Sequence, residues 1–106
     1  MARSAKTTDS QTARIRQKLE EEYLPKHPDA QIDVYRYNPV SIRVRILDPD
    51  FAGKDVRERE DMVWPILDTL PDRVLTDLSI LLLLPPEERE ASLLSLEFDD
   101  PSRSRL

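Results

Sequence analysis

The stretch that decides the fold is Ile42-Arg43-Val44-Arg45-Ile46-Leu47-Asp48-Pro49-Asp50-Phe51-Ala52-Gly53-Lys54. Apolar and charged residues alternate through its first half, which is the pattern of a half-buried β-strand. The Asp-Pro-Asp that follows indicates a tight turn, and the only glycine of the sequence indicates a position with positive φ or a close approach. Asp55 and Glu58 then form a capping box at a helix start. The stretch therefore predicts a strand, a turn and a helix in succession.

Length and composition limit the chain to one small domain. It has 106 residues, of which 39% are hydrophobic and 35% are charged, and a domain of this size buries only about two-thirds of its unfolded surface. The sequence has no cysteine, which excludes disulfides and thiolate chemistry. It has neither the apolar run of a membrane span nor the apolar segment of a secretory signal, so we expect a cytoplasmic protein with no membrane association.

Charge is divided unevenly along the chain. The formal net charge is −5, with a weakly basic first 45 residues and a strongly acidic stretch over residues 46–100. An acidic surface repels a phosphate backbone, whose binding depends on clustered Lys and Arg. We interpret this small acidic protein as one whose surface charge serves solubility, and we do not favour nucleic acid as its partner.

The chain divides into a domain and two tails. We expect a disordered tail over residues 1–11, a single domain over residues 12–98 and a C-terminal tail over residues 99–106. Thr12 can cap the first helix, and Pro25 ends it. The apolar stripe of that helix recurs every four residues at Ile15, Leu19 and Tyr23.

Two strands, over residues 31–37 and 42–47, predict a hairpin with one core face. The face opposite the core would carry four residues that we call the basic aromatic platform: Tyr35, Tyr37, Arg43 and Arg45. Such a platform could stack nucleic-acid bases. The alternative, which we favour, is cross-strand pairing with an arginine lying over a tyrosine.

The remaining chain predicts two further helical regions and one strand. The helix after Asp55 contains Pro65, which predicts a kink or two short helices meeting near Trp64. Residues 77–84 form a nearly continuous apolar run that predicts a third strand, and Pro85-Pro86 starts a last helix. The order is α-β-β-α(α)-β-α, an α+β fold with a three-stranded mixed sheet, helices packed on one face and a right-handed crossover.

Two leucines of the third strand are candidates for an interaction surface. Strand alternation directs Leu81 and Leu83 away from the face formed by Leu78, Ile80, Leu82 and Leu84. Leucines on an open sheet face need a cover. The C-terminal helix could supply it within the chain, and a protein partner or a second copy could supply it instead.

The order of elements, with Phe51-Ala52-Gly53-Lys54 at its centre, resembles the BolA family of the type II KH-like fold. Between about residues 41 and 88, further positions match the family pattern: Arg59, Met62-Val63-Trp64, Leu78 and Pro86-Glu87-Glu88. The resemblance implies a BolA-like fold. In that family a histidine opening the third strand helps hold an iron–sulfur cluster shared with a monothiol glutaredoxin. Here Thr76 stands in its place, and the short loop Asn38-Pro39-Val40 offers no second ligand, so we expect a divergent member without this cofactor.

Three polar features of the sequence are candidate sites. His27 lies in a loop bounded by prolines and has no evident partner, so we interpret it as a solvated residue rather than a switch. Asp48 and Asp50 could bind a hard cation, but we favour the interpretation that their carboxylates cap the turn by accepting backbone N–H groups. Gly53-Lys54 could receive a phosphate at the helix start, although acidic residues surround it. The sequence therefore predicts no metal site, no bound cofactor and no catalytic residue.

The sequence offers no nucleophile with its base, so we expect a protein without enzymatic activity. The leading hypothesis is a small adaptor or regulatory domain that binds a protein partner or forms a homodimer. The alternative is a KH-like protein that binds single-stranded nucleic acid. The candidate interaction surface comprises Tyr35, Tyr37, Arg43, Arg45, Phe51, Gly53, Lys54, Arg59, Leu81 and Leu83.

Overall fold

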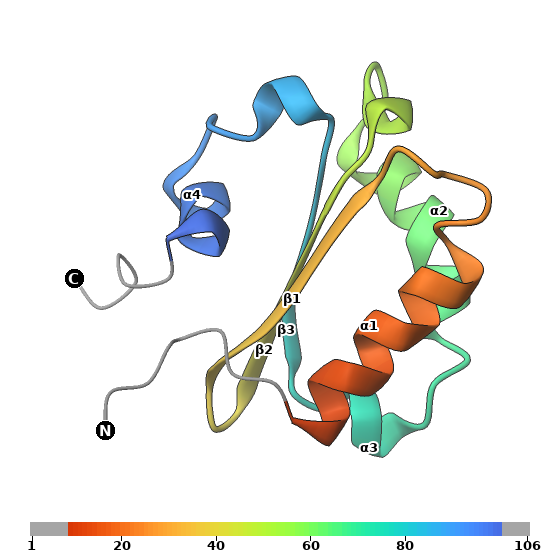
Figure 1. Ribbon diagram of the computed structural model, residues 1–106, viewed down its shortest axis with the longest axis vertical. Coiled ribbons are helices and arrows are strands. Elements are labelled where there is room, and N and C mark those ends of the chain that lie inside the picture. Colours follow the sequence, from red (N-terminus) through yellow and green to blue (C-terminus); the bar gives the residue numbers. More distant parts are fainter. Residues whose placement is uncertain (1–8, 101–106) are drawn as a thin grey trace.

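The computed structural model describes residues 9–100, which form a three-stranded sheet with helices on both of its faces (Figure 1). The elements in chain order are α1 (Ser10–Glu22), β1 (Gln31–Asn38), β2 (Ser41–Leu47), the 3₁₀ turn η1 (Pro49–Phe51), α2 (Val56–Leu67), α3 (Asp72–Leu75), β3 (Leu78–Leu84), the 3₁₀ turn η2 (Pro86–Glu88) and α4 (Leu93–Asp99). The predicted α+β class is confirmed. Within residues 9–100, no helix is long and apolar enough to cross a membrane.

The sheet has the mixed topology that the sequence predicts. Its strand order is β1-β2-β3. β1 and β2 form an antiparallel hairpin in which Val34 lies opposite Val44. β3 runs parallel to β2, because α2 and α3 carry the chain back to the other end of the sheet between these strands.

The N-cap of α1 is three residues earlier than Thr12, the cap predicted from the sequence. Asp9 is the N-cap, and its carboxylate accepts a hydrogen bond of 2.9 Å from the backbone N–H of Thr12. The Thr12 hydroxyl in turn accepts from the backbone N–H of Asp9, which completes a capping box. Thr12 is therefore a member of the box rather than the cap itself. We expected tails over residues 1–11 and 99–106. Residues 1–8 of the first and residues 101–106 of the second lie outside the described part of the chain.

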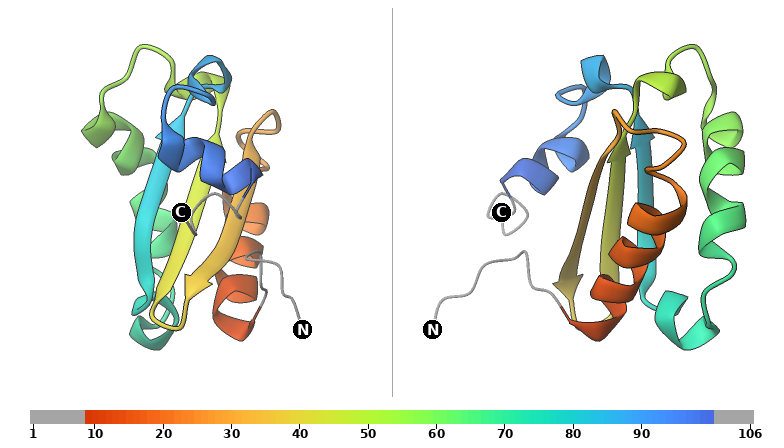
Figure 2. Two further views of the ribbon diagram at one scale, coloured as in Figure 1. Left: turned by 90° about the vertical axis from the view of Figure 1, so that its left-hand side faces the viewer. Right: turned by 45° about the vertical axis from the view of Figure 1, so that its right-hand side comes forward.

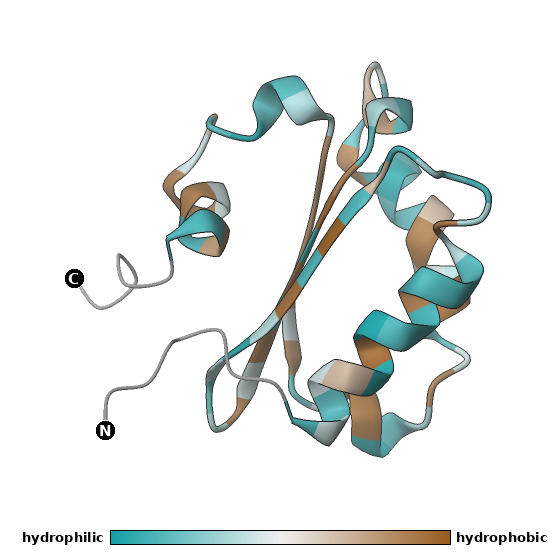
Figure 3. Ribbon diagram, in the orientation of Figure 1, coloured by the Kyte–Doolittle hydropathy of each residue, from teal (hydrophilic) through white to brown (hydrophobic). Residues whose placement is uncertain are grey.

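The main core lies between the sheet and the layer of α1, α2 and α3. Ile42, Val44 and Ile46 of β2 are fully buried there, and α1 contributes its predicted apolar stripe of Ile15, Leu19 and Tyr23. Figure 3 shows hydrophobic segments alternating with hydrophilic ones along the ribbons of α1 and α2. Burial of each such aliphatic side chain contributes roughly 1.5–3 kcal/mol, so the central strand anchors the fold.

The expectation that all helices pack on one face is wrong in one respect, because α4 lies across the opposite face of the sheet (Figure 2). Ser95 and Phe98 of α4 are buried. The Phe98 ring meets the Tyr35 ring edge-on, with 5.2 Å between ring centroids. The predicted last helix does not start at Pro85-Pro86 either. These prolines lead into the η2 turn, and α4 begins only after Ser92, whose hydroxyl caps it.

A bulge in β3 reverses the expected orientation of its leucines. Leu78 lies opposite Ile42, Ser79 has no opposite residue, and Ile80 lies opposite Arg43. The extra residue shifts the alternation by one position. Leu81 and Leu83 therefore lie on the core face, Leu83 being only 6% exposed, and the prediction that they form an open face is wrong.

α2 is one helix through Pro65, rather than two short helices meeting near Trp64. Pro65 falls in the last turn of this helix. Its missing N–H removes the hydrogen bond that Asp61 would otherwise accept, and the helix ends soon afterwards at Leu67.

Candidate functional site

The basic aromatic platform is covered by α4 and is not a free surface. Arg45 is fully buried, and its guanidinium donates to Asp33 Oδ2 at 2.8 Å and to Asp99 Oδ1 at 2.8 Å. It also donates to the backbone carbonyl of Ser95 at 2.7 Å. Burial lowers the pKa of Arg45, whereas the hydrogen bonds to Asp99 and Asp33 raise it. The net result is a raised pKa. Arg45 therefore fixes α4 to the sheet instead of facing solvent.

Arg43 and the two tyrosines complete this covered face. Arg43 donates to Glu97 of α4 at 2.6 Å and to the Tyr35 hydroxyl at 3.2 Å. Its guanidinium lies 3.7 Å from the centroid of the Tyr37 ring, so the favoured alternative of an arginine over a tyrosine is confirmed. Tyr35 is only 1% exposed, and burial raises its pKa above the usual value. A base could not stack on Tyr35 or Arg45 while α4 is in place.

The turn before α2 divides into a buried and an exposed part. Phe51 is fully buried and lies 6.4 Å from the Tyr23 ring between centroids, so it serves the core. Gly53 adopts a φ of +79°, as its single occurrence suggested. Lys54 is exposed and donates from Nζ to the Asp50 carbonyl at 2.9 Å. Of the residues predicted as interaction sites in this turn, Gly53 and Lys54 are exposed and Phe51 is not.

A groove of about 240 Å³ lies between α2 and the outer edge of β3. Its lining combines four consecutive leucines of β3 with residues of α2 and η2: Val56, Arg59, Glu60, Leu81, Leu82, Leu83, Leu84 and Glu88. Val56 of α2 is 69% exposed and extends this lining to the protein surface. Arg59, Leu81 and Leu83, predicted as interaction residues, therefore line one concave apolar surface.

Arg59 joins the two sides of this groove. It donates from Nη1 to the Leu83 carbonyl at 2.9 Å and lies 3.4 Å from Glu88 Oε1. The bond to Leu83 satisfies a carbonyl of β3, which pairs with β2 on one side alone. The Arg59 Nε is buried and makes no hydrogen bond. The predicted importance of Arg59 thus has a structural basis at the edge of the sheet.

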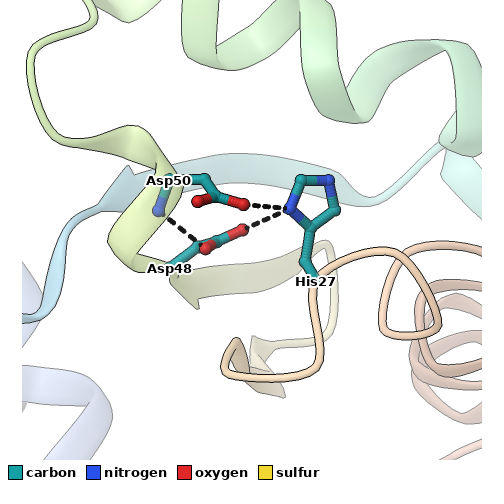
Figure 4. A group of neighbouring side chains, drawn as sticks. All are labelled: His27, Asp48 and Asp50. Carbon is teal, nitrogen blue, oxygen red and sulfur yellow. Dashed lines mark hydrogen bonds and ion pairs between the residues drawn. The ribbon is translucent and has the colours of Figure 1, made fainter.

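A second polar cluster lies near the C-terminal end of β3, where the Asp48 N–H donates to the Leu84 carbonyl at 3.0 Å (Figure 4). His27 comes from the loop after α1, Asp48 from the end of β2 and Asp50 from η1. The His27 Nδ1 lies 2.8 Å from Asp50 Oδ2 and 3.1 Å from Asp48 Oδ2. One ligand atom of each residue lies within 4.8 Å of the others. The interpretation of His27 as a solvated residue without a partner is wrong.

Asp48 and Tyr23 form the buried side of this cluster. The Asp48 side chain is 2% exposed, and its Oδ1 accepts from the Asp50 N–H at 2.9 Å, so the preferred capping role is confirmed. Its Oδ2 accepts from the Tyr23 hydroxyl at 2.5 Å. Burial, followed by this hydrogen bond to a carboxylate, raises the pKa of Tyr23 far above its usual value. Tyr23 is therefore a neutral donor.

The meeting of Tyr23, His27 and Asp50 is not predicted above from the sequence. One signal was available, because Tyr23 and His27 are four residues apart at a helix end. The chain continues for one more turn there, with the His27 N–H donating to the Tyr23 carbonyl at 3.1 Å, and the two rings stack with centroids 4.2 Å apart. The approach of η1 to this loop depends on tertiary packing and leaves no pattern in the sequence.

Thr76, which stands in place of the BolA-family histidine, is exposed at the C-cap of α3. The neighbouring Asp77 pairs with Arg36 at 3.1 Å. Nothing in the described residues brings a histidine to this position, because His27 lies in the loop after α1.

No family model and no curated protein matches this sequence. Among solved structures, the BolA domain of SufE1 from Arabidopsis thaliana is similar, with a TM-score of 0.46 and 23% sequence identity. The alignment covers 76% of this chain and 99% of that chain. At this identity the likeness describes the path of the backbone and does not extend to ligands or activity.

Proposed function

We propose that this chain is a non-enzymatic adaptor of the BolA-like type that binds an extended segment of a protein partner along β3. The observation that carries the proposal is the combination of an edge strand and an apolar groove. β3 is the last strand of the sheet, and its leucines line the groove beside α2. Edge strands with adjacent apolar pockets bind extended peptides by strand addition.

The backbone of β3 supports this mode of binding. Alternate residues of an edge strand direct their N–H and C=O groups away from the sheet, where a further strand can pair with them. The Leu84 carbonyl of β3 accepts a hydrogen bond from the backbone N–H of Asp48, which follows β2. The backbone N–H and C=O groups of Leu83 and Leu81 therefore face away from β2. Arg59 already bonds the Leu83 carbonyl. The Leu81 groups would supply the first hydrogen bonds to a partner strand.

The side chains around the groove define the partner's chemistry. The floor is leucine-rich, and the exposed Val56 extends it onto α2. Glu60 and Glu88 lie at its rim, and the Glu88 side chain is 44% exposed. Carboxylates at a rim favour basic partner residues and steer their approach. The groove therefore suits a segment with alternating apolar side chains flanked by Lys or Arg.

The KH-like alternative is less well supported. Its main candidate residues, Arg43 and Arg45, are bound to Glu97 and Asp99 of α4. A nucleic acid would have to compete with these carboxylates inside the same molecule. This engagement favours a protein partner over single-stranded RNA or DNA.

A peptide library displayed on phage provides the test, with the full chain as bait. We expect enrichment of segments with alternating apolar residues and flanking Lys or Arg, which bind in titrations with a synthetic copy of the enriched peptide. Amide NMR shifts should change along β3 and α2. The critical variant is Val56→Arg and its matched control is Val40→Arg, because the two valines are 69% and 70% exposed but only Val56 lines the groove.

Loss of binding in Val56→Arg with unchanged binding in Val40→Arg would support the proposal. Equal binding by both variants, or shifts confined to the face under α4, would overturn it. Sedimentation of the free chain gives a separate result, since a dimer disrupted by Val56→Arg would show that a second copy, rather than another protein, fills the groove. Binding of single-stranded RNA that weakens with salt would favour the KH-like alternative.

A further inference from the structure

We propose that His27, Asp48 and Asp50 bind one divalent transition-metal ion of the Zn²⁺ class. His27 comes from the loop after α1, and Asp48 and Asp50 come from the turn between β2 and α2, where Asp48 caps η1. Their ligand atoms converge on one point between His27 and the two carboxylates (Figure 4). This site is independent of the groove and of the proposed adaptor function.

The distances suit a metal ion. Zn²⁺ is held about 2.0–2.2 Å from imidazole nitrogen and carboxylate oxygen, so two neighbouring ligand atoms lie about 3.0–3.5 Å apart. The Nδ1 of His27 is 2.8 Å from Asp50 Oδ2 and 3.1 Å from Asp48 Oδ2. Only small rotations of the exposed Asp50 side chain are needed to open these distances.

The charge of the cluster also favours a cation. Asp48 is almost fully buried, yet among residues 9–100 its ion-pair partner is His27 alone. Lys54 donates to the backbone carbonyl of Asp50 and not to either carboxylate. Two carboxylates and a neutral imidazole carry two negative charges, which a divalent ion neutralises. A buried carboxylate that lacks a fixed cation is costly, so this neutralisation would stabilise the site.

The surroundings hold the ligands in position. The Tyr23 hydroxyl fixes Asp48 Oδ2 at 2.5 Å, and the Tyr23 ring stacks on the imidazole of His27. Such outer contacts orient metal ligands in known sites. The Asp50 side chain is 60% exposed and the His27 side chain 20% exposed. An ion can therefore enter from solvent on the Asp50 side, and water can complete its coordination.

The ligand types select the metal. Imidazole suits Zn²⁺ and its transition-metal neighbours, whereas Mg²⁺ and Ca²⁺ favour sites made of oxygen atoms alone. One nitrogen and two carboxylates form a mixed set. We therefore expect Zn²⁺ and Co²⁺ to bind more tightly than Mg²⁺ or Ca²⁺.

His27 is the only histidine of the sequence, so its imidazole signals in NMR spectra can be assigned without ambiguity. The experiment uses the full chain without an affinity tag, titrated with ZnCl₂ near pH 7. We expect one equivalent of Zn²⁺ to change the ¹⁵N shift of His27 Nδ1 to that of a metal-bound nitrogen, with the Nε2 signal remaining protonated. Calorimetry measures the affinity in parallel, and Co²⁺ absorption reports the coordination number.

His27→Ala and Asp50→Asn are expected to weaken Zn²⁺ binding by about 100-fold and at least about 10-fold. Asp29→Asn removes an exposed carboxylate two residues after His27 and should leave the affinity unchanged. Asp50 is at the surface, so its variant tests the site even if Asp48→Asn fails to fold. Zn²⁺ binding that persists in His27→Ala, a Nδ1 shift that does not respond to Zn²⁺, or equal affinity for Mg²⁺ would overturn the proposal.

Discussion

Arg45 of β2 and Asp99 of α4 form a two-point ion pair across the second face of the sheet, with Nη2 to Oδ1 at 2.8 Å and Nη1 to Oδ2 at 3.1 Å. Arg45 is fully buried in this arrangement. The residues are 54 positions apart in sequence. This pair connects the C-terminal helix to the sheet together with the Arg43–Glu97 ion pair and the buried ring of Phe98 on Tyr35.

Replacement of the buried arginine tests its role. Arg45→Met keeps much of the side-chain volume but leaves Asp33 and Asp99 without their cation. We expect a loss of about 3 kcal/mol in the free energy of unfolding, because removal of one partner from a buried ion pair exposes the cost of burying the other. Urea unfolding measures it. Arg57→Met, on the exposed side of α2, is the control and should change stability by less than about 0.5 kcal/mol. A similar small change in Arg45→Met would contradict the assignment.

The carboxylate partner predicts a dependence on acid pH. Hydrogen bonds from Arg45 and Arg89 hold the pKa of Asp99 well below its usual value of 3.8. A carboxyl with a lowered folded-state pKa stabilises the fold above its unfolded pKa, and this stabilisation is lost as the pH falls toward the folded-state value. Asp99→Asn should therefore be less stable than the natural chain by about 1–2 kcal/mol at neutral pH. The difference should shrink below about pH 4.

Unfolding curves of both chains between pH 7 and pH 2 measure this difference. Asp29→Asn removes an exposed carboxylate of the loop before β1, and we expect it to follow the natural chain at every pH within about 0.5 kcal/mol. A gap between Asp99→Asn and the natural chain that stays constant down to pH 2 would show that the Asp99 carboxylate does not supply the stabilisation.

A third prediction concerns the hydrogen bond from Tyr23 to Asp48. Tyr23→Phe removes the hydroxyl and leaves a buried oxygen with one partner fewer, which should cost about 1–2 kcal/mol. A double-mutant cycle with Asp48→Asn separates the energy of this hydrogen bond from the other effects of each substitution. We expect a coupling energy of at least about 1 kcal/mol between the two positions. Additive effects within about 0.3 kcal/mol would mean that the short contact contributes little.

The sequence was sufficient for the order of elements because apolar alternation sets both the type and the register of each strand. Ile32 and Val34 must lie on the same face as Val44 and Ile46, and a shift of one residue would place all of them in water. The crossover between β2 and β3 follows from the length of the helical segment. These features are local or nearly local, and each agrees with the fold.

Two features depended on information that the alternation pattern does not contain. The bulge at Ser79 adds one residue to β3 and sends Leu83 to the core, and nothing in an almost continuous leucine run marks where the alternation shifts. The side of the sheet on which α4 packs is likewise not set by the spacing of its apolar residues. Glu97 and Asp99 fit the arginines of the second face.

The polar cluster was missed for a different reason. The roles of Asp48 as a cap and of His27 as a loop residue can both be predicted from near neighbours. Their meeting depends on how closely the loop after α1 approaches η1, which packing of Tyr23 and Phe51 decides. Sequence patterns report periodicity along one segment and contain no distance between two loops.

The last prediction returns to Gly53, whose φ of +79° lies in the left-handed region. A Cβ added there would meet no atom within 4 Å, so the cost of substitution comes from the backbone conformation alone. Gly53→Ala should lose about 1 kcal/mol of unfolding free energy. Gly53→Asn should lose less, because asparagine tolerates this region, and Gly53→Val should lose more, because β-branched residues rarely adopt it. Thermal or urea unfolding of the three variants measures the order Asn, Ala, Val. Equal losses in all three would show that the turn relaxes to another conformation and that Gly53 does not fix the path from β2 into α2.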